Sequence, residues 1–314
     1  MEETIERGTA IRVFLCTVSE RISFMQTRLD CIPCFMRQAL QAARFCTDDR
    51  TTHEKVLRSV LKVVDEQSWQ TTPADIACSV HFTVMDVLGI DDPYKKQKEL
   101  SNETVLALYD TMKESIVHHA DPLHRAVEIA IAGNIMDYGA LTRFDFAETM
   151  ETVHQRRFAV NDVAVLKRDL KEAKTIAYLA DNAGEIVCDR LFMETVTDLY
   201  GDKDWHLFVK AHPIINDATR DDAASAGLHP TPSLKIDTVD MNRSHDDRTD
   251  DDFRSRLARY DVVISKGQGN YEALSNAATV NLYFLLMAKC HLIAGDLGVD
   301  TGDIVALKIN NGYK

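Results

Sequence analysis

The 314-residue chain has no apolar run of about 18 residues, the length that a membrane-spanning helix needs. Basic residues are also in the minority, because 36 lysines and arginines stand against 49 aspartates and glutamates, for a formal charge of −13. A nucleic-acid partner needs a basic face for its phosphates, so this balance argues against one. The sequence therefore predicts no membrane and no nucleic-acid association, and its 45% hydrophobic content is typical of a soluble globular protein.

Cysteine is sparse and odd in number, at seven residues. No convincing secretory leader precedes the chain, because the apolar run at 11–16 is too short and has charged flanks. Both features favour a reducing, cytoplasmic environment over a disulfide framework. Met25 is an alternative start, so we expect residues 1–24 to be an amino-terminal extension without a functional role.

Two patterns divide the rest of the chain at about residue 165. Residues 25–165 have helical periodicity and are predicted to form an all-helical domain. Residues 166–314 alternate short apolar strands with helices, which predicts an α/β layer: a Rossmann-like, mostly parallel sheet with helices on both faces. The expected helices are 34–45, 52–67, 73–89, 92–112 and 121–138, and the expected strands include 175–180, 205–210, 235–239, 261–265 and 280–286.

The stretch IAYLADNAGEIVCDR at 176–190 reads as a buried strand, a tight polar turn and a helix. Asp181 and Asn182 then lie at the carboxyl end of a strand, where open α/β sheets bind their ligands. A carboxylate beside an amide oxygen suits a hard cation such as Mg²⁺ or Mn²⁺. The alternative is that one of the two merely caps the helix.

Two further strand ends carry polar groups of the same kind. Asn216 and Asp217 follow the second strand, and Lys266 begins the glycine-containing turn S-K-G-Q-G-N at 265–270. Glycines and a helix amino end suit an anion, and the lysine adds a full charge. The turn is neither a G-x-x-x-x-G-K-[ST] loop nor a G-x-G-x-x-G motif. Each turn alone could be a plain connection, but three in one sheet favour a metal and phosphate site.

Cys31 and Cys34 have the C-x-x-C spacing of zinc and redox sites. No second such pair follows, so a second metal site, a structural role and redox chemistry all stay open. Small residues flank Asn134 in A-G-N at 132–134, which allows close approach by another element or by a ligand.

The sequence resembles the metal-dependent damage-control phosphatases. This family was long catalogued as a domain of unknown function and is related to acidic-residue methyltransferase-like proteins. The C-x-x-C form places it near the prokaryotic-type branch. The resemblance runs from about residue 29 to 308 and rests on five segments in order: LDCIPCFMRQAL (29–40), DPLHRAVEIAIAGNIMDYG (121–139), LADNAGEIVCDRL (179–191), KAHPIINDATRDDA (210–223) and SKGQGNYEAL (265–274).

The resemblance implies a helical region over a Rossmann-like core and hydrolysis of phosphate monoesters with Mn²⁺, Co²⁺, Ni²⁺ or Mg²⁺. It implies metal ligation by Asp181, Asn182 and Asp217, and catalytic roles for Asp181, Lys266 and Glu185. Phosphate or substrate contacts are expected from the residues Asn134, Asn216, Lys266, Gly267, Gly269 and Asn270.

The expected reaction is hydrolysis of small phosphorylated metabolites, such as sugar phosphates or nucleotide-related compounds. The nucleophile is either a metal-bound water or the Asp181 carboxylate. Two other readings stay open: a non-catalytic metal- or metabolite-binding protein, and a carboxyl methyltransferase that uses S-adenosylmethionine. One departure bears on the substrate, because V-D-M-N-R-S-H-D at 239–246 replaces the glycine- and proline-containing loop usual in relatives.

Overall fold

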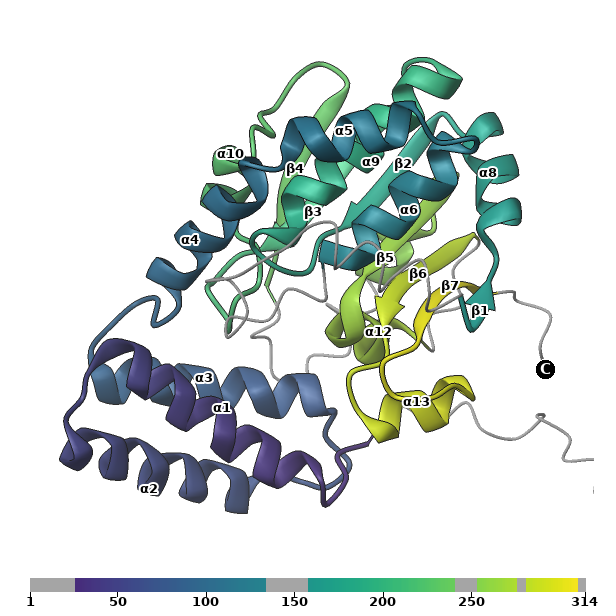
Figure 1. The fold of residues 1–314 in the computed structure, drawn as a ribbon. Helices are drawn as coiled ribbons and strands as arrows, with labels where there is room; N and C mark the ends of the chain where they lie inside the picture. Colours follow the sequence, from purple (N-terminus) through teal and green to yellow (C-terminus); the bar gives the residue numbers. More distant parts are fainter. Residues whose placement is uncertain (1–25, 134–157, 241–252, 276–280, 310–314) are drawn as a thin grey trace, which may run out of the picture.

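The chain builds one mixed sheet with helices on both faces and a bundle of three helices beside it (Figure 1). The computed structural model describes residues 26–133, 158–240, 253–275 and 281–309. No helix within these ranges is long and apolar enough to cross a membrane.

Seven strands of the described ranges follow the order β1-β7-β6-β5-β2-β3-β4. Every neighbouring pair is parallel except β6 and β7, which run antiparallel. This arrangement confirms the predicted mostly parallel α/β sheet. The strands are β1 (Val160–Asn161), β2 (Thr175–Leu179), β3 (Asp204–Lys210), β4 (Leu234–Val239), β5 (Val262–Lys266), β6 (Leu282–Met287) and β7 (Ile304–Ile309).

The central strands are apolar because both of their faces are covered. All five residues of β5 are buried, as are four of the five in β2, and a strand without a solvent face reads as a continuous apolar run. Tyr178 of β2 is in register with Leu207 of β3 on one side and Ile264 of β5 on the other. The carboxyl ends of these three strands therefore meet at one edge of the sheet.

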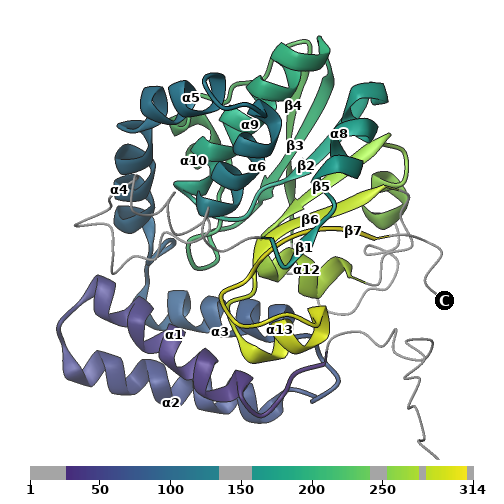
Figure 2. The same ribbon diagram turned by 45° about the vertical axis from the view of Figure 1, so that its right-hand side comes forward.

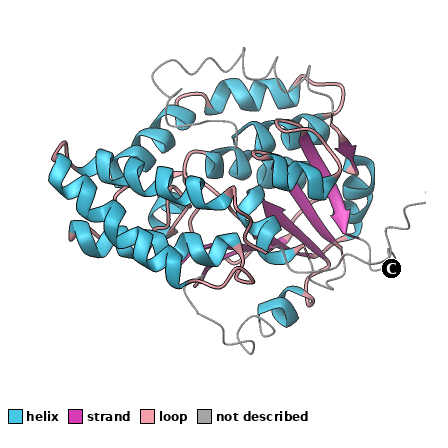
Figure 3. Ribbon diagram, turned by 90° about the horizontal axis from the view of Figure 1, so that it is seen from below, coloured by secondary structure: helices cyan, strands magenta, loops and turns pink. Residues whose placement is uncertain are grey.

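Successive residues of β2 point to opposite faces, and each face has its own core. Ile176 and Tyr178 lie in a core shared with α5 (Tyr109–Val117), α6 (Pro122–Ala132), α8 (Val163–Glu172) and α9 (Glu185–Tyr200). Ala177 and Leu179 lie in the opposite core with α12 (Gly267–Leu274) and α13 (His291–Leu297). Figure 3 shows these helices around the strands from below.

Helices α1 (Cys31–Cys46), α2 (Arg50–Glu66) and α3 (Pro73–Leu88) pack on one another around a third core (Figure 2). Local sequence defines α3 sharply. Thr72 accepts a hydrogen bond from the amide of Asp75, Pro73 occupies the first turn, and Gly89 ends the helix at φ +66°. The bundle also contacts the sheet layer through α3 and α12.

The structure departs from the predicted elements in two places. The single helix expected over 92–112 is wrong, because the chain forms α4 (Lys95–Leu106) and then α5 after a break at Ala107 and Leu108. Strands β1 and β7 were not predicted. The division of the chain at residue 165 stays a prediction, although α5 and α6 share a core with the sheet rather than with α1–α3.

Candidate active site at three strand ends

The polar residues that follow β2 and β3 lie side by side. Asn182 and Asp217 form an isolated antiparallel bridge. The amide of Ala218 donates to the Asp181 carbonyl at 2.8 Å, and the amide of Ala183 donates to the Asn216 carbonyl at 2.9 Å. The two predicted strand ends are thus joined by backbone hydrogen bonds, which fix the spacing between their side chains.

The third strand end approaches Asp181 from the other side. Gly267, the first residue of α12, has φ +75°, and a β-carbon built there would lie 1.8 Å from Asp181 Oδ2. Only glycine leaves room for this carboxylate, and only glycine adopts this φ without strain. The Asp181 carboxylate therefore lies against the amino terminus of α12, where the helix dipole favours a negative charge.

Asn182 is oriented by the carboxylates beside it. Its Nδ2 donates to Asp181 Oδ2 at 2.7 Å and to Glu185 Oε2 at 2.9 Å. Because both amide hydrogens are used, the side-chain carbonyl oxygen Oδ1 is the atom left to receive a cation. Asp181, Asn182 and Asp217 together offer two carboxylates and an amide oxygen, which is the ligand chemistry of a hard divalent ion.

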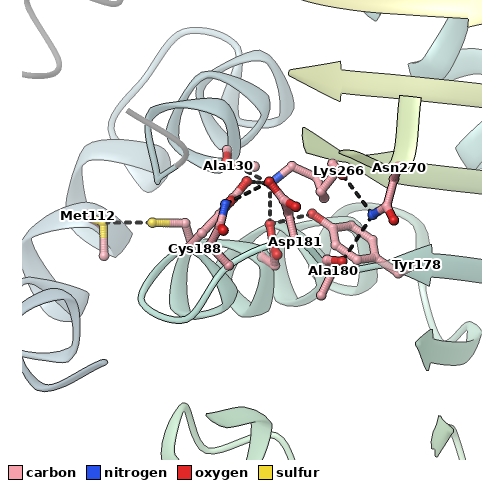
Figure 4. Close-up of polar contacts among 11 residues, drawn as sticks. Met112, Ala130, Tyr178, Ala180, Asp181, Cys188, Lys266 and Asn270 are labelled. Carbon is pink, nitrogen blue, oxygen red and sulfur yellow. Dashed lines mark hydrogen bonds and ion pairs between the residues drawn. The ribbon is translucent and has the colours of Figure 1, made fainter. Parts of the chain in front are cut away.

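Lys266 lies in a fully buried ionic cluster on the α6 and α9 side of the sheet (Figure 4). Its Nζ donates to Glu185 Oε1 at 2.7 Å, to Asp189 Oδ1 at 2.6 Å and to the Ala130 carbonyl at 2.8 Å. These three acceptors use all three ammonium hydrogens. The two carboxylates raise the pKa of Lys266 against the effect of its burial, so the lysine stays charged.

Asp189 belongs to the same cluster and was missed by sequence reasoning. Tyr178 donates to its Oδ1 at 2.7 Å, and burial raises the pKa of Asp189 to about 7 against the lowering effect of Lys266. The available signal was its spacing, because Asp189 follows Glu185 by four residues and shares a face of α9. Gly133 allows α6 to approach this face, since a β-carbon there would lie 3.1 Å from Glu185 Cα.

Asp217 lies beside a second lysine that sequence reasoning also missed. Lys210, the last residue of β3, is buried, and its Nζ is 3.8 Å from Asp217 Oδ2. Burial raises the pKa of Asp217 to about 7, with Lys210 opposing this shift and Asp181 adding to it. A carboxylate whose pKa is raised by burial and by a second carboxylate nearby would be stabilised in its charged form by a cation.

The other predicted contact residues are placed as follows. Asn270 Nδ2 donates to the carbonyls of Lys266 at 2.8 Å and Ala180 at 3.1 Å, so its amide ties α12 to the end of β2. A β-carbon on Gly269 would meet no described atom within 4 Å. Asn216 contributes its backbone carbonyl to the joined strand ends, and Asn134 lies outside the described residues.

Comparison with known proteins identifies the family of the chain. Residues 27–305 match the family model of the damage-control phosphatase ARMT1-like domain. The chain belongs to this family.

Relatives from archaea cover nearly the whole chain. A damage-control phosphatase of Archaeoglobus fulgidus is 32% identical over 88% of this chain and 96% of its own length. One from Pyrococcus horikoshii is 27% identical over 90% of this chain and 98% of its own length. An uncharacterised Methanocaldococcus jannaschii protein is 32% identical, covering 89% and 94% of the two chains.

A solved structure has the same architecture. The crystal structure of a DUF89 family protein from Pyrococcus horikoshii superimposes with a TM-score of 0.79 at 26% identity, covering 91% of this chain and all of that one. The names of these relatives support a phosphatase role in damage control for this ARMT1-like chain.

In this damage-control phosphatase fold, α4 holds both the turn after β2 and the loop after β3. Asn102 Oδ1 accepts from the amide of Gly184 at 2.6 Å, and its Nδ2 donates to Asp222 Oδ1 at 3.0 Å. Asp222 Oδ2 in turn accepts from the amide of Thr219 at 2.9 Å. One buried asparagine thus connects the turn after β2 to the loop after β3, and no sequence motif pointed to it.

The bundle covers the site through α3. Burial raises the pKa of the Cys78 thiol to about 12, and the nearby Asp217 adds to the shift while Lys210 opposes it. Phe82 of α3 packs edge-on to His212, with ring centroids 6.3 Å apart. Cys78 therefore lies beside the strand-end site and not beside the C-x-x-C pair.

Cys31 and Cys34 are free cysteines at the start of α1. Burial raises the pKa of Cys31, and Glu272, Cys290 and Cys34 add to the shift. In the ranges that the structure describes, no three His, Cys, Asp or Glu side chains gather closely enough to hold a metal ion. This holds for the cysteine pair and for the strand ends alike, where the third expected ligand is the amide of Asn182, and the function of the pair stays a prediction.

Proposed function

We propose that the chain is a divalent-metal-dependent phosphatase that hydrolyses phosphate monoesters of small metabolites. The observation that carries this proposal is the convergence of Asp181, Asn182 and Asp217 at the ends of β2 and β3, against the amino terminus of α12. A metal that polarises a phosphoryl oxygen and neutralises its charge needs an oxygen-rich site of this kind.

The donor set fits a hard cation such as Mg²⁺ or Mn²⁺. Asn182 is held with its carbonyl oxygen available, and the Asp217 carboxylate has a raised pKa because it is buried near Asp181. Mn²⁺, Co²⁺, Ni²⁺ and Mg²⁺ all accept oxygen ligands. When bound, the ion would act as a Lewis acid on the phosphoryl group.

The residues around this set would orient it. Glu185 accepts a hydrogen bond from Lys266 on one carboxylate oxygen and from Asn182 on the other. The buried cluster therefore fixes the orientation of the Asn182 amide through Glu185. In this proposal Glu185 and Lys266 are positioning residues. The predicted direct contact of Lys266 with phosphate would require its ammonium group to leave three hydrogen-bond acceptors.

The substrate is proposed to be a small phosphorylated metabolite, in keeping with the damage-control role of the family. The segment 239–246 departs from the pattern of relatives, and Asp240 is its last described residue, because residues 241–252 lie outside the described ranges. The choice among sugar phosphates and nucleotide-related compounds is left to a substrate screen.

The test is hydrolysis of p-nitrophenyl phosphate by metal-stripped protein after separate addition of Mn²⁺, Co²⁺, Ni²⁺ or Mg²⁺. We expect at least one metal to restore turnover in the wild type and none to restore it in Asp181→Asn, which removes a ligand charge. Thermal unfolding would verify that the variant is folded. A folded wild type that stays inactive with every metal, or an Asp181→Asn variant with full activity, would contradict the proposal.

A further inference from the structure

Two buried lysines flank the strand-end site, on opposite faces of the sheet. Lys266 contacts α6 and α9, whereas Lys210 contacts Asn270 of α12. Asp181 lies against the first residue of α12, so it is Lys210 that shares a face with the Asp181 carboxylate. The two lysines therefore approach the site from different faces of the sheet, and Lys210 is on the face of the Asp181 carboxylate.

Their hydrogen bonding differs as well. Lys266 Nζ has three acceptors within 2.8 Å. Among the described residues, Lys210 Nζ donates to one acceptor, Asn270 Oδ1 at 3.1 Å, and its ion pair with Asp217 at 3.8 Å is longer than a hydrogen bond. Burying an ammonium group whose N–H donors are not all hydrogen-bonded costs free energy, unless a bound ligand accepts the remaining hydrogen bonds.

The residues around Lys210 place its ammonium group beside the strand-end site. Asn270 holds Lys210 from one side, and the same amide is fixed by the carbonyls of Ala180 and Lys266. Asp217, a proposed metal ligand, has its Oδ2 3.8 Å from the same Nζ. An anion that bridged to a cation on Asp217 would therefore bring its remaining oxygens next to Lys210 Nζ.

We propose that Lys210, and not Lys266, is the lysine that binds the phosphoryl group. This inference rests on the proposed phosphatase function and assigns its phosphate-binding residue. Lys210 donates to an oxygen of the phosphoryl group, while Lys266 holds Glu185 and Asp189 in the buried cluster. A charge-assisted hydrogen bond of this kind is shorter and stronger than a neutral one.

The experiment uses full-length wild type, Lys210→Met and Lys210→Arg, with Lys203→Met as a matched control. Lys203 is also buried, but it lies just before β3, at the opposite end of that strand, where its Nζ donates to the carbonyl of Ala173 at 2.7 Å. Calorimetry measures binding of Mn²⁺ and then of inorganic phosphate to the Mn²⁺-loaded protein, and kinetics on p-nitrophenyl phosphate separates KM from kcat.

We expect Lys210→Met to weaken phosphate binding about 10- to 100-fold while Mn²⁺ still binds. Lys210→Arg should recover part of the loss, and Lys203→Met should bind phosphate like the wild type. If Lys210→Met fails to fold, Lys210→Gln takes its place. Phosphate affinity within twofold of the wild type in the folded variant would overturn the inference, as would a loss of equal size in Lys203→Met.

The two proposals fail in different ways. If the wild type binds phosphate through Lys210 but hydrolyses no phosphate ester with any metal, the phosphatase function fails and the phosphate-binding role of Lys210 stands. If the wild type is an active phosphatase and Lys210→Met matches it in both KM and phosphate affinity, only the assignment of Lys210 is wrong.

Discussion

At the scale of single residues, the site depends on where side chains point. Lys266 was predicted to contact phosphate because it precedes a glycine turn, yet its Nζ lies between Glu185, Asp189 and the Ala130 carbonyl. The sequence reveals that a lysine ends the strand but not which face of the sheet it points to. That direction depends on the register of the strand, which is a property of the whole sheet.

Gly267 and Gly269 occupy the same turn but should respond differently to alanine. Gly267→Ala places a β-carbon on the Asp181 carboxylate and forces alanine to φ +75°, so we expect a loss of at least about 1–2 kcal/mol of stability and loss of activity. Gly269 has no positive φ and an open neighbourhood, so Gly269→Ala should fold with nearly unchanged stability. Denaturant unfolding of both variants measures the difference.

An equal loss of stability in the two glycine variants would contradict this account of the turn. Activity of Gly269→Ala carries separate information. If the phosphoryl group approaches the backbone at this position, as the sequence predicts, the folded variant should show a raised KM.

At the scale of elements, helices from the amino-terminal half position the site. Gly184 lies in the turn after β2 and Asp222 in the short helix α10 (Arg220–Ser225) that follows β3, and Asn102 of α4 is hydrogen-bonded to both. Ile215, next to the Asn216–Asp217 pair, has φ +48°, a strained value for a β-branched residue, and packs against the α1–α3 core. The loop that carries Asp217 is therefore held in place by the bundle.

We expect Asn102→Ala to destabilise the protein and to weaken metal binding. It leaves the Gly184 amide without its buried acceptor, at a cost of about 1–3 kcal/mol. It also removes the donor to Asp222 Oδ1, while Asp222 Oδ2 keeps its hydrogen bonds from Lys98 and Thr219. Glu103→Ala, at an exposed neighbour on α4, is the control and should stay within about 0.5 kcal/mol of the wild type.

Chemical denaturation and Mn²⁺ titration of the folded protein measure the two effects. A metal affinity in Asn102→Ala equal to that of Glu103→Ala would show that α4 supports the fold without setting the distance between the two ligand-bearing loops.

At the scale of the whole molecule, the sequence was enough to predict a mostly parallel sheet and three strand ends that meet at one edge of it. Parallel neighbours place their carboxyl ends at one edge, so Asp181, Asn182 and Asp217 could be grouped before any contact was known. The buried cluster around Asp189, the Asn102 connection and the place of Lys210 could not be grouped, because each depends on the direction in which a side chain points and on helix packing, and not on the shared edge of the sheet. Strand β7 follows β6 and a short helix and so keeps the alternation, but its antiparallel place beside β6 is set by the fold and not by the sequence pattern.

The most direct test of the central claim is an anomalous difference map from crystals of the Mn²⁺-loaded protein. The account predicts a strong peak bounded by Asp181, Asn182 and Asp217 at the carboxyl ends of β2 and β3. A protein that binds Mn²⁺ with its peak elsewhere, such as beside Cys31, Cys34 and Cys290, would contradict it.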